Sequence, residues 1–347
     1  TPKPSSAASD VYKRQVMSAE HDRTYPPVDD SALVAHGFDV AHHDGGEDAL
    51  GPWGFTTIAR PAPKERATGA IALYLHGWSD YFFHPHVANF FNERGYDFWA
   101  IDLRRNGRSL REGDVATAIG DLSDYAEEIS RTIDMASTAA RERGLTPKKP
   151  VIYAHSTGGI TTVTWAARNP GQASALLLNS PWLELHGGPL VRRALLPMLE
   201  ALARTQPLRT VVPGTPDFYA RTLHTHFGGQ WDWHVPYKPF ESFPMPACTL
   251  AAVARAQNQL AGGLNIREPI FMTASTRSAL EPFFTRRAYT SDAILNVEDQ
   301  VRNARHAGPD LTVARIPGAT HDMALALEAP RKLFFLELAA YMDSRGL

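Results

Sequence analysis

The sequence predicts an α/β fold, in which a mostly parallel sheet carries helices on both faces. From about residue 54 onward, short apolar, β-branched or aromatic runs alternate with longer helical patterns. No internal repeat or low-complexity segment interrupts this alternation. The chain has 347 residues, which is long enough for one large α/β domain with a sizeable insertion.

Eight segments are expected to form the strands of the sheet. Two opening strands come first, and the second of them ends at Pro61, which cannot donate a ladder hydrogen bond. The remaining segments are short apolar runs, typical of parallel strands that are buried on both faces. The eight expected strands are residues 37–42, 55–59, 71–75, 96–101, 151–154, 175–178, 270–273 and 311–316.

Helical patterns occupy most of the intervals between these strands. Glycine follows two of them, at Gly95 and Gly144, where it is a typical stop signal. The expected helices are residues 87–94, 122–143, 158–168, 190–202, 249–260, 297–304 and 331–343.

The regular alternation breaks after the sixth strand, in segment 181–247. This segment begins with an apolar helical pattern and continues as a proline-broken, aromatic-rich stretch. We expect it to be a helical cap that crosses the carboxyl ends of the strands, where open α/β sheets bind ligands. The core then comprises residues 17–180 and 248–347, with the cap at 181–247.

The first sixteen residues are excluded from this reasoning about the fold. Residues 5–15 (SSAASDVYKRQ) resemble a translated sequencing adapter, and Met17 would then be the natural start. The alternative is a genuine disordered tail, so residues 1–16 are expected to be non-native or disordered.

Composition limits the partners and the compartment that we expect. A formal net charge of −2 provides no basic field for nucleic acid, and no apolar run approaches the roughly 18 residues of a membrane span. Cys248 is the only cysteine, so neither an internal disulfide nor a cysteine-rich metal site can form. We therefore expect a cytoplasmic protein without metal, cofactor, nucleic-acid partner or integral membrane association. The oligomeric state stays open.

The stretch 151–159 (VIYAHSTGG) joins a buried-strand pattern to a serine and a helix start. A serine hydroxyl is a weak nucleophile, so a protein that uses one must hold it on a sharp strand-to-helix turn beside a base. Such a turn favours glycine two positions before and after the serine. Gly158 fits this pattern, and Ala154 departs from it by one methyl group. Ser156 is therefore the candidate nucleophile.

A serine nucleophile also needs a histidine base and a carboxylate that orients the histidine. One chain order for this set is serine, acid, histidine, with the histidine after the last strand. His321 occupies that position, directly after residues 311–316. We expect Asp292 to be the acid, at a strand-to-helix loop, while Glu281, Glu298 and Asp299 remain competitors.

The backbone N–H groups of Trp78 and Thr157 are the expected oxyanion-hole donors, because they follow the first buried strand and the serine respectively. Further side chains near the predicted strand ends and in the cap are candidates for substrate binding. These are His76, Gly77, Tyr81, Trp231 and Trp233. His155 adjoins the serine but is interpreted as structural.

Several stretches together resemble the alpha/beta-hydrolase superfamily, in its branch of monoglyceride lipase, lysophospholipase and serine-aminopeptidase-like proteins. The resemblance covers about residues 54–345 and implies an alpha/beta-hydrolase fold and ester hydrolysis through an acyl-enzyme, without metal or cofactor. It departs from the family pattern at Ala154, at Asn106 and in the long connection before Asp292. The stretches that carry the resemblance are residues 74–78 (YLHGW), 100–109 (AIDLRRNGRS), 154–158 (AHSTG), 291–295 (SDAIL) and 317–321 (PGATH).

The expected function is hydrolysis of a small or acyl-chain carboxylic ester, with Ser156 as the nucleophile. A serine aminopeptidase is the first alternative, but it needs acids in the cap to hold a free amine, and the cap sequence has few. A catalytically silent binding protein is the second alternative, and the intact Ser156 and His321 argue against it. Between residues 181 and 246 the acids are Glu184, Glu200, Asp217, Asp232 and Glu241.

Overall fold

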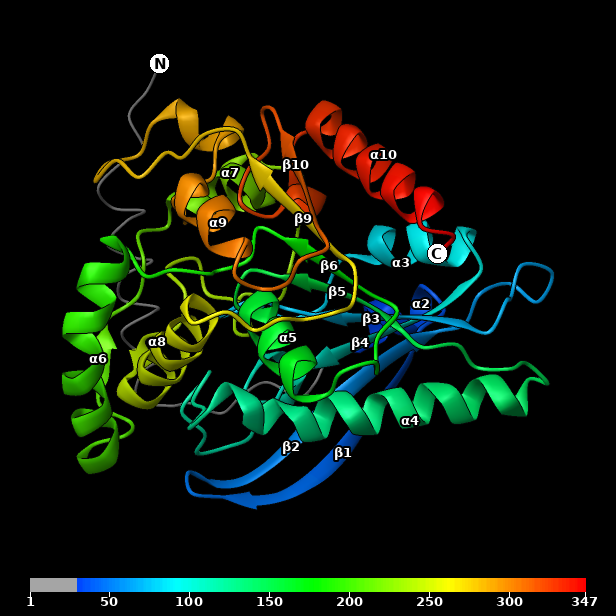
Figure 1. Ribbon diagram of the computed structural model, residues 1–347, viewed down its shortest axis with the longest axis horizontal. Helices are drawn as coiled ribbons and strands as arrows, with labels where there is room; N and C mark the ends of the chain where they lie inside the picture. The colour runs from blue at the N-terminus through cyan, green and yellow to red at the C-terminus, as the bar shows by residue number, and fades with distance from the viewer. Residues whose placement is uncertain (1–29) are drawn as a thin grey trace.

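The computed structural model describes residues 30–347, so the expected tail at 1–16 lies outside the described residues. Its centre is an eight-stranded sheet with the order β1-β2-β4-β3-β5-β6-β9-β10 (Figure 1). β2 runs antiparallel to both of its neighbours, and every other pair in the sheet is parallel. The strands are β1 (Asp39–Asp48), β2 (Gly51–Arg60), β3 (Ala70–Leu75), β4 (Tyr96–Asp102), β5 (Val151–His155), β6 (Ala175–Asn179), β9 (Ile270–Ser275) and β10 (Leu311–Ile316).

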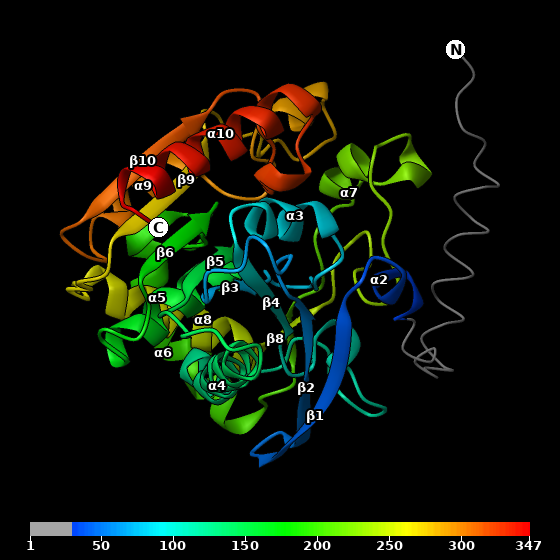
Figure 2. The same ribbon diagram turned by 90° about the vertical axis from the view of Figure 1, so that its right-hand side faces the viewer.

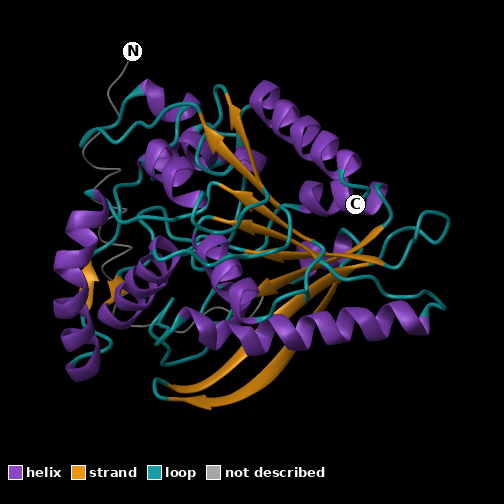
Figure 3. Cartoon of the chain, in the orientation of Figure 1, coloured by secondary structure: helices purple, strands orange, loops and turns teal. Residues whose placement is uncertain are grey.

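All eight predicted strands are present, and the prediction of a mostly parallel sheet with helices on both faces is confirmed (Figure 3). β1 is longer than its predicted range of 37–42 and forms a tight hairpin with β2. The extra residues are polar and pair through their backbone, so the hydrophobic pattern could not show them. Gly45 suits this hairpin, because a Cβ there would lie 2.0 Å from the ring of Trp53.

Alternate residues of the central strands enter two separate hydrophobic clusters, one on each face of the sheet. On β3, Leu73 and Leu75 face the first cluster, while Ala72 and Tyr74 face the second. Helices α4 (Ala126–Glu142), α5 (Thr157–Arg168), α8 (Ala247–Ala261) and α9 (Val297–Ala304) cover the first face, and α2 (Ser31–Ala35), α3 (Pro85–Glu93) and α10 (Glu328–Ser344) cover the second (Figure 2).

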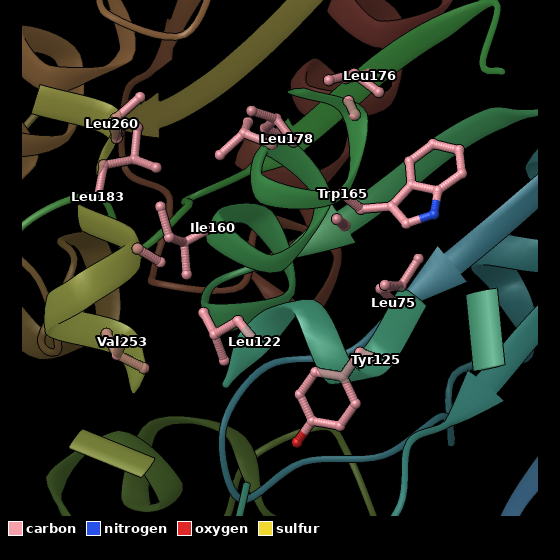
Figure 4. Close-up of a cluster of buried hydrophobic side chains, with 14 of the residues drawn as sticks. Leu75, Leu122, Tyr125, Ile160, Trp165, Leu176, Leu178, Leu183, Val253 and Leu260 are labelled. Carbon is pink, nitrogen blue, oxygen red and sulfur yellow. The ribbon is translucent and has the colours of Figure 1, made fainter. Parts of the chain in front are cut away.

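The first cluster fixes the helix that follows the candidate nucleophile. Ile160 of α5 lies between Leu178 of β6 on one side and Leu122 of the 3₁₀ turn η2 (Leu122–Tyr125) and Val253 of α8 on the other (Figure 4). Burial of each such side chain contributes about 1.5–3 kcal/mol to folding. The start of α5 therefore has a well-defined position relative to the ends of the strands.

The helix predicted over 122–143 begins with a separate 3₁₀ turn, η2 (Leu122–Tyr125), before α4. Asp121 caps this turn, because its side chain accepts a hydrogen bond from the backbone N–H of Ser123. α10 starts at Glu328, three residues before the predicted start at 331. Pro330 does not disrupt it, because the first turn of a helix needs no intrahelical donor there.

The regular alternation breaks after β6, within segment 181–247. Its longest helix, α6 (Gly188–Thr205), packs on α8. The fully buried Arg192 of α6 donates hydrogen bonds to Glu184 (2.7 Å) and to Asn258 of α8 (2.6 Å). A third, largely aromatic cluster joins the later part of the segment to the core loops. The elements after β6 are α6 (Gly188–Thr205), β7 (Thr210–Val212), α7 (Phe218–Leu223), the 3₁₀ turn η3 (Thr225–Phe227) and β8 (Met245–Pro246).

Across residues 30–347, none of the helices has both the length and the apolar character that a membrane crossing requires.

Candidate active site

Ser156 lies on the turn between β5 and α5, and its backbone adopts φ +53° and ψ −115°. A non-glycine residue reaches this region only when its surroundings hold it there. The Ser156 N–H donates to the carbonyl of Asn179 over 3.0 Å. Position 158 requires a glycine, because a Cβ there would lie 2.5 Å from the His76 carbonyl oxygen. Ala154 is fully buried in the first cluster, so its methyl group adds to the core.

The structure brings Ser156, His321 and Asp292 together in one hydrogen-bonded relay. The Ser156 hydroxyl lies 3.0 Å from Nε2 of His321, and Nδ1 of His321 lies 2.9 Å from Oδ2 of Asp292. An ionised Asp292 accepts a hydrogen bond from the N–H at Nδ1. The unprotonated Nε2 can then take a proton from the serine. The relay is shielded from bulk water, because the exposed fractions of Ser156, His321 and Asp292 are 8%, 3% and 0%.

Asp292 is held by more than the histidine. Its Oδ1 accepts the backbone N–H groups of Ile294 (2.9 Å) and Leu295 (2.8 Å), and its Oδ2 accepts the side-chain amide of Gln300 (2.9 Å). Burial alone would raise the pKa of this carboxyl, but the charge of His321 and these hydrogen bonds hold it below its usual value. Asp292 therefore stays ionised across neutral pH.

The expected strand-to-helix loop at Asp292 differs from the observed arrangement. The chain leaves β9 at Ser275 and reaches Asp292 only after an excursion through the 3₁₀ turn η4 (Arg286–Thr290). The Asp292 N–H donates to the Arg277 carbonyl over 2.9 Å, and this bond returns the chain to the end of β9. The position resembles that of a strand-end loop, although no regular strand directly precedes Asp292.

The three competing acids are engaged elsewhere. Each forms an ion pair with an arginine and has no hydrogen bond to His321. The pairs are Glu281 with Arg287, Glu298 with Arg315 and Asp299 with Arg302.

The two expected oxyanion donors lie beside the serine. Thr157 is the first residue of α5, where a helix leaves its N–H groups without intrahelical partners. Trp78 follows Gly77 after β3, and both residues line the same cavity as Ser156. Gly77 permits this close approach, because a Cβ there would lie 3.0 Å from Cβ of Ser156. The indole N–H of Trp78 donates to Thr117 over 3.1 Å, which anchors the ring.

A cavity of about 540 Å³ opens above Ser156 and His321. Most of its wall is apolar and comes from segment 181–247 and from the chain around Asp292. Apolar side chains on that wall include Trp182, Leu185, Leu195, Val212, Leu250 and Ile294. A volume in this range is typical of sites that enclose small molecules.

Two of the predicted substrate-binding residues, Gly77 and Trp233, line this cavity, whereas three do not. His76 lies beneath it, because its Nδ1 donates to the Gly77 carbonyl (2.7 Å) and its Nε2 accepts the N–H of Leu103 (3.1 Å). With both ring nitrogens occupied, His76 supports the loop instead of contacting substrate.

Tyr81 and Trp231 are likewise displaced from their expected position. The Tyr81 hydroxyl accepts the N–H of His234 over 2.7 Å, and its ring belongs to the third cluster. The Trp231 indole donates to the Leu325 carbonyl over 2.7 Å. Both side chains therefore join segment 181–247 to the core, and aromatic spacing could not separate this role from substrate contact.

His155 lines the cavity, although the sequence favoured a purely structural role for it. Its Nδ1 donates to the Asn179 carbonyl over 3.1 Å, and its ring centroid lies 4.8 Å from that of His321. Burial lowers the pKa of His155, so the ring is neutral at working pH.

A buried ion pair that the sequence did not indicate also lines the cavity. Lys238 of segment 181–247 contacts Oδ1 of Asp80 over 2.5 Å. Burial would raise the pKa of Asp80, but the charge of Lys238 brings it down to about 2. The two residues are 158 positions apart in the chain, so no local motif could reveal their pairing.

Within residues 30–347, no group of three or more histidine, cysteine or acidic side chains is arranged to hold a metal ion.

Sequence comparisons found similarity to one protein family and to a curated lipase. A family model described as serine aminopeptidase, S33, matches residues 67–226. A monoacylglycerol lipase from Mycolicibacterium smegmatis is 30% identical over 156 residues, which is 44% of this chain and 49% of the relative. The aligned part therefore spans about half the length of that curated relative.

Structure comparisons show the same fold in several solved proteins. A monoacylglycerol lipase from Paleococcus ferrophilus matches with a TM-score of 0.60 and 15% identity, over 89% of this chain and 99% of that one. A soluble variant of monoglyceride lipase from Saccharomyces cerevisiae matches with a TM-score of 0.61 and 14% identity, over 89% of this chain and 95% of that one. A carboxyl esterase from Bacillus coagulans matches with a TM-score of 0.60 and 15% identity, over 89% of this chain and 99% of that one.

The Asp80–Lys238 pair predicts a stability difference that depends on pH. Asp80→Asn leaves Lys238 without its partner and should destabilise the protein by about 2–4 kcal/mol at pH 6. The folded-state pKa of Asp80, about 2, lies below its ordinary 3.8, so its contribution is complete above that ordinary value and disappears as the pH falls toward 2. Urea midpoints of the wild type and Asp80→Asn should therefore converge between pH 4 and pH 2.

The matched control is Glu112→Gln, which changes an exposed carboxylate and should have little effect at any of these pH values. A gap between Asp80→Asn and the wild type that stayed constant from pH 6 to pH 2 would contradict the assigned pairing.

Proposed function

We propose that the chain is a member of the alpha/beta-hydrolase superfamily and a serine hydrolase that cleaves carboxylic esters. The observation that carries the proposal is the relay of Ser156, His321 and Asp292 at one end of a largely apolar cavity. In this proposal, the relay supplies a nucleophile, a base, and a carboxylate that orients the base and fixes its tautomer.

In the proposed reaction, the Ser156 hydroxyl attacks the ester carbonyl while Nε2 of His321 takes its proton. The N–H groups of Trp78 and Thr157 stabilise the tetrahedral oxyanion, and Asp292 stabilises the charged imidazole. His321 then protonates the leaving alcohol, which departs and leaves an acyl group on Ser156. A water molecule repeats the sequence on the acyl-enzyme and releases the acid. In this scheme His321 carries the proton in each transfer, first between Ser156 and the leaving alcohol and then between water and Ser156.

We propose that segment 181–247 is a cap over a core of residues 17–180 and 248–347, of which residues 17–29 lie outside the described part of the chain. Much of the apolar cavity wall comes from this segment, which favours an acyl chain as the group held there. Gly77 and Trp233 are the proposed substrate contacts among the residues expected from the sequence. The named relatives that cleave monoacylglycerols support an acyl ester as the substrate class. A cytoplasmic location is part of the proposal and rests on the single, buried Cys248.

The charges in the cavity favour an ester over a peptide with a free amino terminus. An aminopeptidase needs an unpaired carboxylate to bind the substrate ammonium group. Among the described residues, the two acids that line the cavity are Asp80, paired with Lys238, and Glu281, paired with Arg287. A silent binding protein is disfavoured because Ser156 and His321 are hydrogen-bonded in a reactive arrangement.

A fluorophosphonate probe should label the folded protein once per chain, on Ser156. Ser156→Ala should abolish the adduct, because the probe reacts only with an activated serine. Ser344→Ala, which changes a serine on α10 away from the cavity, should leave labelling intact. Intact-mass spectrometry measures the adduct, and a folded wild-type protein that stays unlabelled would refute the proposed function.

Asp292→Asn should lower kcat/KM for ester hydrolysis by about 10³–10⁴-fold, because the amide no longer fixes the proton on Nδ1 of His321. Glu298→Gln is the matched control at a competing acid, and it should change the rate little because Glu298 pairs with Arg315 on the surface. Steady-state kinetics on a p-nitrophenyl ester provide the measurement. The reverse ranking of the two variants would reject Asp292 as the acid.

Among p-nitrophenyl esters, kcat/KM should rise with acyl chain length until the chain fills the apolar cavity. Each buried methylene contributes about 0.8 kcal/mol, or up to about fourfold per carbon. Aminoacyl anilides should be poor substrates by the same assay. A preference for anilides with a free amino group would instead support the aminopeptidase.

A further inference from the structure

The residue after His321 is fully buried and takes no part in the relay. Oδ1 of Asp322 accepts the side-chain amide of Asn179 over 2.8 Å and the N–H of Ala324 over 2.9 Å. The backbone carbonyl of Asn179 accepts the N–H of Ser156. From the core side, Asn179 thus ties the serine turn to the loop that carries His321.

The other side of the same loop is held by segment 181–247. The backbone N–H of Asp322 donates to the hydroxyl of Tyr219 over 3.0 Å. Tyr219 lies on α7, lines the cavity and presents its ring to His321 at a centroid distance of 5.7 Å and an angle of 78°. One cap side chain therefore touches both the imidazole and the backbone that supports it.

This support is needed because the His321 loop has little regular structure of its own. It leaves β10 at Ile316, and its next regular element is the single 3₁₀ turn η5 (Met323–Leu325). An unsupported loop would let the imidazole move away from Ser156, and a displacement of 1 Å lowers reactivity strongly. Hydrogen bonds from outside the loop therefore determine where the base lies.

The phenol oxygen of Tyr219 is the chemically specific part of this contact. A phenylalanine would keep the ring against His321, but it would leave the Asp322 N–H without its acceptor in a largely buried place. Burial raises the pKa of Tyr219 well above its ordinary value, so the phenol stays protonated at working pH.

We infer that Tyr219 is a positioning residue, which holds His321 in line with Ser156 through the Asp322 backbone. The inference rests on the proposed function, and it goes beyond it by making the cap part of the reactive arrangement. When α7 packs against the His321 loop, His321 lies within hydrogen-bonding distance of Ser156. When α7 moves away, the His321 loop loses a hydrogen bond and a ring contact together.

Tyr219→Phe tests this inference. It should lower kcat for a p-nitrophenyl ester by about three- to tenfold, the range for one lost hydrogen bond, with KM nearly unchanged. The rate of fluorophosphonate labelling should fall in parallel. A purely structural role would not produce this separation of kcat from KM.

Tyr81→Phe is the matched control. It removes another phenol oxygen that accepts a backbone N–H between the same segment and the core, that of His234, and this hydrogen bond does not involve the His321 loop. Its kcat should stay close to the wild-type value. Equal losses in both variants would mean general loosening of the cap, and an unchanged kcat or a raised KM in Tyr219→Phe would also overturn the inference.

Proton NMR provides a readout that does not need turnover. The Nδ1 proton of His321, hydrogen-bonded to Asp292, should give a downfield resonance that is sharp in the wild type and Tyr81→Phe and broadened in Tyr219→Phe. If the wild type neither labels nor hydrolyses esters, the proposed function fails, and this resonance still decides the role of Tyr219. An equally sharp signal in all three proteins would refute that role.

Discussion

The turn at Ser156 requires three backbone segments to approach one another with no side chains between them. Gly158 lies against the carbonyls that end β3, Gly77 lies against Ser156, and a Cβ at Gly159 would meet Pro181 at 2.5 Å. The separations at Gly158 and Gly159 are shorter than a real Cβ tolerates, and the one at Gly77, 3.0 Å, is tight, so a side chain at any of the three glycines would force its neighbours to move. Together they hold Ser156 at a positive φ, and the ends of β3, β5 and β6 converge on it as a consequence.

The hydrogen bonds around Asn179 extend this constraint to the base. Its carbonyl accepts both the Ser156 N–H and Nδ1 of His155, while its side chain reaches Asp322. Because neighbouring parallel strands end at the same edge of the sheet, one residue at the end of β6 contacts the serine turn and the histidine loop. The relay therefore depends on strand register as much as on the three side chains that form it.

The sequence predicted the elements that depend on local pattern. The eight strands, the Ser156 turn and the position of His321 follow from apolar runs, glycine and chain order. The full length of β1 was not predicted, because its added residues pair through backbone alone. Contacts between distant segments were also missed, such as Lys238 with Asp80, since sequence carries no signal for pairing across 158 positions. Tyr81 and Trp231 show the same limit, because the sequence does not distinguish an aromatic residue that joins segment 181–247 to the rest of the chain from one that contacts substrate.

The buried pair of Asp80 and Lys238 has consequences for the chemistry as well as for stability. Because the two opposite charges lie side by side at one wall, the pair adds little net charge to the cavity. Asp292 is the carboxylate that hydrogen-bonds directly to His321, with 2.9 Å between its Oδ2 and Nδ1. In the proposed reaction, Asp292 therefore stabilises the imidazolium that forms during proton transfer. Under the proposed function, such a wall suits an uncharged ester, because the charged residues Asp80, Lys238 and Glu281 that line it are already paired within the described residues.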